Sequence, residues 1–218
     1  MIKKILFGSK DKMKSAYLWN TCAAMLNAFQ TVFILMLISR IDPVIDAGVF
    51  TIAFAIGNLM MAIGKYGIRQ FQVSDVEEKY SFKEYTVARI ITSIIMIAAS
   101  FVYVGVNLAS GLYDSSKSIV IILICLAKVI DAVEDVIHGM FQQYLRLDVA
   151  GKILSIRMCT YIFVYLVCYY FSKNLILTSA VALLVSFIQF VILNYTAIRG
   201  FEIKKKTFEI KNVKNIFV

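Results

Sequence analysis

Residues 119–142 read IVIILICLAKVIDAVEDVIHGMFQ, a stretch that joins a hydrocarbon half to a charged half. At 100° per residue, its polar side chains share one helical face of about 120°. They are Lys128, Asp131, Glu134, Asp135, His138 and Gln142. A charged residue at the bilayer centre costs about 2.5–3.5 kcal/mol, so four such groups exposed to lipid would cost on the order of 10 kcal/mol. The face is therefore expected to point into a helical bundle, a water-filled cavity or a partner.

This stretch is the fourth of six long apolar segments, each able to cross a hydrocarbon core of about 30 Å as a helix. The segments lie at about 15–39, 46–66, 87–109, 118–141, 153–171 and 175–199. The chain is 60% hydrophobic, with a mean hydropathy of +0.78, which is too apolar for an ordinary soluble domain. The sequence predicts an all-α polytopic membrane protein, a bundle of six transmembrane helices.

Basic residues collect in every second gap between these segments, and this alternation predicts the topology. One side would carry most of the Lys and Arg residues, whereas the other would carry only Arg40, Lys117 and Lys173. Because basic loops mark the cytoplasmic side, both termini are expected in the cytoplasm. The net charge of +9 lies in loops beside membrane spans, where it orients the chain and contacts anionic membrane lipids. Nucleic acid is not an expected partner.

The organisation follows in three parts: a cytoplasmic N-terminal segment at 1–14, a six-helix transmembrane lobe at 15–199, and a basic cytoplasmic tail at 200–218. The largest cytoplasmic gap, about 67–86, holds two capping-box patterns, which begin at Ser74 and Ser81. A capping box starts a helix. The gap is therefore predicted to contain a short surface helix that begins near Ser74, followed by the start of the third span.

Polar residues form stripes on two other segments. Asn20, Asn27, Gln30 and Thr31 share about 100° of the first segment, and Ser179, Ser186 and Gln189 share about 80° of the sixth. Such amides and hydroxyls either bond neighbouring helices or solvate a wet interior shared by several helices. Two stripes together favour the wet interior.

The charged face of the fourth segment allows three interpretations. The first is a salt-bridged network that holds helices together, in which Lys128 meets Asp131, Glu134 and Asp135 reach His138, and Arg157 supplies a counter-charge. The second is a substrate pathway near the membrane midplane. The third is an enzyme whose carboxylates bind Mg²⁺ to activate a lipid diphosphate. No second acidic cluster lies on another span, and His138 is the only histidine, so no metal or other cofactor is expected.

Several stretches resemble the amino-terminal half of bacterial polysaccharide biosynthesis proteins of the oligosaccharide flippase type. These proteins belong to the multidrug/oligosaccharidyl-lipid/polysaccharide exporter superfamily. The similarity spans about residues 10–200 and is most specific at YGIRQFQVSD, residues 66–75. It is carried also by AYLWNT at 16–21, AGVFTIAFAI at 47–56, Tyr85, Arg89, GMFQQ at 139–143 and Arg146.

The resemblance implies a function that composition alone does not. Family members move a saccharide carried on a polyprenyl diphosphate across the bacterial inner membrane, by rocking two six-helix lobes around a cationic cavity. It implies that this chain is the first lobe, working with a second six-helix lobe or as a homodimer. Residues 200–218 would then be either a basic cytoplasmic tail or a truncated inter-lobe linker. The first segment lacks Lys and Arg in its core, which favours a capsule, O-antigen-like or teichoic-type exporter over a peptidoglycan-precursor flippase. A non-transporting scaffold for surface-polysaccharide assembly remains the alternative.

Roles for the polar residues follow from the same resemblance. Substrate binding is expected from Lys128 and Arg157, which would hold the diphosphate, and from Asn20, Asn27, Gln30 and Gln142, which would solvate sugars. Coupling to protons or Na⁺ is a hypothesis drawn from the charged face itself rather than from the resemblance, and it is expected from Asp131, Glu134, Asp135 and His138. The mechanism needs no covalent chemistry, so the chain is not expected to be an enzyme.

Overall fold

A computed structural model describes residues 2–42, 44–201 and 208–217, and within these ranges every regular element is a helix. The helices are α1 (Ile2–Phe7), α2 (Lys12–Ile41), α3 (Asp46–Lys65), α4 (Ile68–Ser74), α5 (Phe82–Ala109), α6 (Ser115–Gln143), α7 (Leu147–Ser172), α8 (Leu175–Ile198) and α9 (Ile210–Asn215). The all-α prediction is confirmed for this part of the chain.

Within the described ranges, five helical segments are long and apolar enough to cross a membrane. They are α2, the α3–α4 segment from Asp46 to Ser74, α5, α7 and α8. These match five of the six predicted segments. The remaining prediction, 118–141, corresponds to α6, which is just as long but carries several charged residues along its length. Length and apolarity therefore identify five helical segments that could cross a membrane.

Most of the long helices begin earlier than the apolar segments predicted, because capping side chains set a helix start and apolarity does not. Asp11 directly precedes α2, and its carboxylate accepts from the backbone N–H groups of Met13 and Lys14 in the first turn. Asp114 caps α6 in the same way, accepting from the Lys117 N–H. Side chains of this kind satisfy the free amides of a first helical turn.

One of the two predicted capping boxes is correct and the other is wrong. Ser81 and Glu84 form a reciprocal box at the start of α5, with the Ser81 N–H donating to Glu84 over 2.6 Å. Ser74 instead ends α4, and its hydroxyl donates back to the Gln70 carbonyl. The short helix thus precedes Ser74. Asp75 follows as the C-cap residue of α4, and its carboxylate accepts from the backbone N–H groups of Lys79 and Tyr80.

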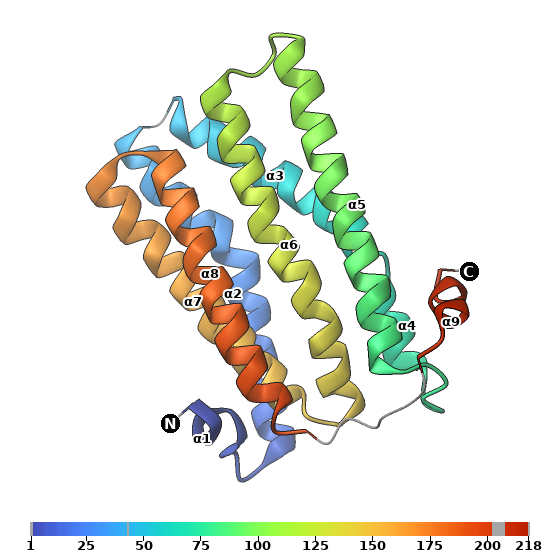
Figure 1. The fold of residues 1–218 in the computed structure, drawn as a ribbon. Coiled ribbons are helices and arrows are strands. Elements are labelled where there is room, and N and C mark those ends of the chain that lie inside the picture. Colours follow the sequence, from blue (N-terminus) through green and yellow to red (C-terminus); the bar gives the residue numbers. More distant parts are fainter. Residues whose placement is uncertain (1, 43, 202–207, 218) are drawn as a thin grey trace.

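Helix α6 runs through the centre of the bundle (Figure 1). It packs against α3 and α5 on one side and against α7 and α8 on the other, while α2 packs chiefly on α7. The connections α2–α3, α5–α6 and α7–α8 gather at one end of the molecule, whereas α1, α4 and the α6–α7 connection lie at the other (Figure 1). The helix with the most charged span is therefore the one that its neighbours enclose most completely.

The short terminal helices dock on the end of the bundle that holds α4. The Lys152 ammonium donates to the carbonyls of Ile5 and Leu6 and so ties α1 to α7. The Glu84 carboxylate accepts from the Glu209 N–H and from the Asn212 side chain, which ties α9 to α5. Of the tail predicted at 200–218, residues 202–207 and 218 lie outside the described part of the chain.

The close packing of α2 on α7 depends on Gly151. A Cβ atom at this position would lie 2.8 Å from the backbone nitrogen of Asn20 and 2.8 Å from the carbonyl carbon of Trp19. Backbone atoms cannot turn aside as a flexible side chain can. We therefore expect Gly151→Ala to force the two helices apart and to destabilise the protein by about 1–3 kcal/mol, the usual cost of overpacking.

The free energy of unfolding in detergent would measure this effect, with Gly105→Ala as the matched control. Gly105 also lies inside a long helix, but a Cβ there meets nothing within 4 Å. Alanine is the better helix former, so the control should be neutral or stabilised by up to about 1 kcal/mol. Equal effects of the two substitutions would show that helix contact at Gly151 is not tight.

Candidate functional site: the charged face of α6 and the cleft at its end

The predicted charged face of α6 is sequestered inside the bundle. We call it the α6 ridge: Lys128, Asp131, Glu134, Asp135, His138 and Gln142. Lys128 is 4% exposed, Glu134 1% and His138 4%. Of the environments that the sequence allowed, the structure places these groups among packed helices, where each charge needs a partner because water is excluded.

The ridge residues nearer the centre of α6 are held by Arg157 of α7. Its guanidinium lies 2.6 Å from one carboxylate oxygen of Asp131 and 2.8 Å from Glu134, and it is 2% exposed. The Lys128 ammonium contacts the other oxygen of Asp131 at 3.3 Å and lies 4.4 Å from the centre of the Phe54 ring. Arg157 is thus the counter-charge that the sequence predicted, and the Lys128–Asp131 pair also forms as predicted. Two cations and two carboxylates balance here.

Glu134 also joins α6 to α8. Its second oxygen accepts from the Asn194 side-chain amide over 2.8 Å. The His138 ring nitrogen lies 3.9 Å from Glu134, too far for a hydrogen bond, and this nitrogen is buried without a hydrogen-bond partner within the described structure. The other predicted partner of His138, Asp135, turns instead toward α5 and α4, because two guanidinium groups attract it there.

Those two guanidinium groups belong to Arg89 and Arg69. Arg89 is fully buried and lies 2.8 Å from Asp135, while Arg69 reaches the other oxygen of Asp135 at 3.4 Å. The second arm of Arg89 donates to the Gly64 carbonyl of α3 over 2.7 Å. A single carboxylate thus serves two arginines, so this half of the network carries one excess positive charge.

Arg69 connects the network to the end of α6. It donates to the Gln142 side-chain oxygen over 3.0 Å, and its side chain is 29% exposed, more than that of any other charged residue in the network. Its contact with Asp135 is also the longest of the arginine–carboxylate contacts here. Arg69 is therefore the cation of this network that can change partners with the least disruption.

A cleft of about 670 Å³ opens beside Gln142, between the start of α2, the α4–α5 connection and the α6–α7 connection. We call it the inner cleft. Polar side chains reach it from all three segments, among them Lys12, Asp75 and Gln143. Its rim is apolar and open: Met13 is 80% exposed, Val76 87% and Leu145 86%. Two residues that line the cleft, Glu78 and Leu145, have left-handed backbones with φ of 52° and 54°, a conformation that often accompanies functional loops.

The other residues predicted to bind substrate or to line a wet interior do not lie together at one site. Asn20 donates to the Leu147 carbonyl over 2.9 Å and so bonds α2 to α7. Gln30 is buried, and its side-chain oxygen lacks a hydrogen-bond partner in the described structure, whereas Asn27 is exposed. On α8, the Ser179 hydroxyl bonds Tyr165 over 2.8 Å. At Asn20 and Ser179 the polar stripes therefore form hydrogen bonds between helices, and they do not line a common wet interior. Of the residues predicted to bind substrate, Gln142 is the one that lines the inner cleft.

Sequence reasoning missed Arg89 and Arg69 as network members, because both lie in a basic segment that already explained topology. A signal for Arg89 was present. Tyr85, Arg89 and Thr92 recur at helical spacing on one face of α5, and all three are buried. The Asn194 contact with Glu134 had no comparable signal, since a lone amide on an apolar helix points to many neighbours.

Comparison of the sequence with protein-family models and with curated proteins gives no match.

Removing Arg89 should destabilise the bundle strongly. Arg89→Met would leave Asp135 with only its long contact to Arg69 and would remove one of the two donors to the Gly64 carbonyl. Breaking a buried ion pair from one side costs about 3–5 kcal/mol. The measurement is the free energy of unfolding in detergent, with Lys83→Gln, an exposed cation on the same helix, as the control.

The double variant Arg89→Met/Asp135→Asn tests whether the unpaired Asp135 carboxylate causes the loss of stability in Arg89→Met. It should recover part of the loss, because the uncompensated carboxylate is then gone. If the single variant were as stable as the Lys83→Gln control, the pairing of Arg89 with Asp135 would not contribute to the fold.

Proposed function

We propose that α6 is a sixth membrane crossing, with both ends of the chain on the cytoplasmic side of a bacterial inner membrane. Helix α6 spans 29 residues, about 44 Å at 1.5 Å per residue, which is long enough to cross. Its charges meet opposite charges inside the bundle, which offsets their cost of insertion. The α2–α3, α5–α6 and α7–α8 connections face away from the cytoplasm in this topology, and the few basic residues in or beside them are Arg40, Lys117 and Lys173.

We further propose that this six-helix bundle is one lobe of an exporter for a saccharide linked to a polyprenyl diphosphate. The observation that carries the proposal is the buried ionised network on the central helix, which meets a polar cleft at its cytoplasmic end through Arg69 and Gln142. Ionisable residues inside membrane bundles commonly mark transport pathways. The resemblance of residues 66–75, which include Arg69, to oligosaccharide flippases supplies the substrate class.

In this mechanism, the diphosphate enters the inner cleft and competes with Asp135 for Arg69. The excess positive charge of the Arg89–Arg69–Asp135 cluster attracts the anion, and the Gln142 and Gln143 amides bond its sugar. Lys128 and Arg157, the cations that the sequence favoured, are both bound to Asp131 and almost fully buried. They serve as the fixed part of the network, and Arg69 takes the role of the cation that meets substrate.

Movement of Arg69 would free Asp135 to bind a proton or Na⁺, which would couple export to an ion gradient. Alternating access needs a second bundle to rock against. We propose a second six-helix lobe, or a second copy of this chain, as that partner. The exposed apolar rim of the inner cleft lies where such a partner would close over a bound headgroup.

A non-transporting scaffold is the second candidate, and the same apolar rim favours it. Met13, Val76 and Leu145 project from the cytoplasmic end in this topology and fit a protein surface, such as that of a glycosyltransferase. The magnesium-enzyme interpretation has less support, since Asp131, Glu134 and Asp135 bind guanidinium groups from other helices rather than converging on one point.

Single cysteines in a cysteine-free background test the sixth crossing. We expect cysteines in place of Leu112, in the α5–α6 connection, and Leu145, in the α6–α7 connection, to react with a membrane-impermeant maleimide from opposite sides. In intact cells only the Leu112→Cys protein should label, and after permeabilisation both should. Labelling of both in intact cells, or of neither, would contradict a crossing by α6 in this orientation.

Flipping in proteoliposomes tests the function. A fluorescent polyprenyl-diphosphate oligosaccharide should move between leaflets when the chain is reconstituted with a second lobe, and Arg69→Gln should slow this movement by about tenfold or more, the loss of a charge-assisted hydrogen bond. Lys79→Gln, an exposed cation of the neighbouring connection, is the control and should flip at the normal rate.

The same vesicles test coupling. Asp135→Asn should remove any dependence of the flipping rate on a proton or Na⁺ gradient. Normal flipping by Arg69→Gln would refute the role of Arg69, and movement of the probe that never exceeds that in protein-free vesicles would favour the scaffold.

A further inference from the structure

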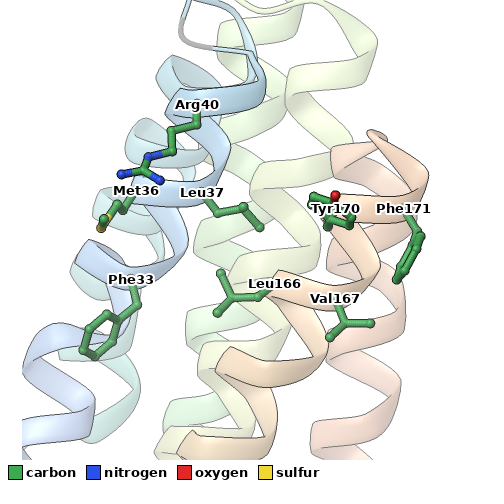
Figure 2. Close-up of a pocket in the computed structure, with 8 residues that line it drawn as sticks. All are labelled: Phe33, Met36, Leu37, Arg40, Leu166, Val167, Tyr170 and Phe171. Carbon is green, nitrogen blue, oxygen red and sulfur yellow. The ribbon is translucent and has the colours of Figure 1, made fainter.

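A second concave surface lies far from the inner cleft, at the opposite end of the bundle. It is a groove of about 450 Å³ between the last turns of α2 and α7 (Figure 2). We call it the α2–α7 groove. Phe33, Met36 and Leu37 line it from α2, and Leu166 and Val167 line it from α7. Leu37 and Leu166 extend toward each other between the two helices (Figure 2).

The groove faces the surroundings of the bundle. Met36 is 54% exposed and Phe33 46%, and on the other wall Tyr170 is 61% exposed and Phe171 80%. All of these lie within helices long and apolar enough to cross a membrane. In a bilayer, the medium that meets this surface is lipid hydrocarbon rather than water. From residue 33 to residue 40 the groove extends about 10 Å along α2, roughly two-thirds of the depth of one leaflet.

One charged residue, Arg40, lines this otherwise apolar surface. It precedes the last residue of α2, at the level where a membrane gives way to water. In the described part of the chain Arg40 has no ion pair, unlike the arginines of the α6 network. Its guanidinium is folded back along α2 and lies beside Met36 (Figure 2). An unpaired guanidinium at this depth attracts a phosphate and can bond it with two N–H groups.

We propose that the α2–α7 groove binds a phospholipid of the outer leaflet that has a net negative charge. One acyl chain occupies the space between Leu37 and Leu166, and the phosphate is bound by Arg40. The Tyr170 ring on the opposite wall is suited to the same boundary, since tyrosine places its ring in hydrocarbon and its hydroxyl among headgroups. The proposal requires α2 and α7 to cross a membrane, and its assignment to the outer leaflet rests on the topology proposed above. It holds whether or not the protein exports a saccharide.

The test is lipid retention during purification. The full chain would be extracted from vesicles that contain equal amounts of phosphatidylglycerol and phosphatidylcholine, and the lipid that remains bound would be counted by native mass spectrometry. Both lipids offer a phosphate to Arg40, but the choline cation of phosphatidylcholine offsets its attraction to the guanidinium. We therefore expect bound phosphatidylglycerol to exceed phosphatidylcholine by about tenfold. Arg40→Gln should bring the ratio close to one. Lys117→Gln, which removes another cation at the same end of the bundle, should leave the ratio unchanged.

A second variant separates the groove from general charge attraction. Val167→Trp places a bulky ring in the groove and keeps Arg40, so it should reduce the amount of bound lipid of both kinds. Excess inorganic phosphate should not displace the lipid, because phosphate has no acyl chain. The proposal is overturned if Arg40→Gln keeps the wild-type preference, if Lys117→Gln loses the preference equally, or if Val167→Trp retains as much lipid as the wild type.

Discussion

The contact of the Arg157 guanidinium with both Asp131 and Glu134 is the interaction on which the structure depends most. The guanidinium nitrogen lies 2.6 Å from an Asp131 oxygen and 2.8 Å from a Glu134 oxygen. All three groups lie inside the bundle, where an unpaired charge is costly and a paired one is tolerated only with good geometry. The pairing explains why a helix with this many charges can occupy the centre. It also explains the order of the bundle, since α7 and α8 must stand where Arg157 and Asn194 can reach Glu134.

The network also changes along α6 from a largely buried, charge-balanced centre to a partly exposed end. Around Arg157, charge is balanced and burial is nearly complete, so rearrangement there would expose carboxylates to hydrocarbon. Around Asp135, two arginines share one carboxylate. Arg69 is partly exposed and bonds Gln142, which lines the inner cleft. A fixed centre and an adjustable end are what an ion-coupled exporter requires. A scaffold would need only the fixed centre.

The sequence predicted the parts of this arrangement that follow from periodicity and solvent. The sequestered face of α6, the Lys128–Asp131 pair and the counter-charge from Arg157 are found in the structure, because an ionised face in hydrocarbon has few alternatives. The partners of Asp135 were missed, since Arg89 and Arg69 lie among the basic residues that the predicted topology already explained. The capping pattern at Ser74 failed for a related reason: Asp75 bonds the backbone that follows it, a preference that depends on the path of the whole connection.

The most direct test of the account is a double-mutant cycle between Arg157 and Glu134, measured as free energies of unfolding in detergent for Arg157→Met, Glu134→Met and the double variant. A buried, bonded pair predicts a coupling energy of about 2 kcal/mol or more, with the double variant far more stable than the two single losses added together. Additive losses, with a coupling below about 0.5 kcal/mol, would mean that these groups are solvated separately and would contradict a dry, paired centre.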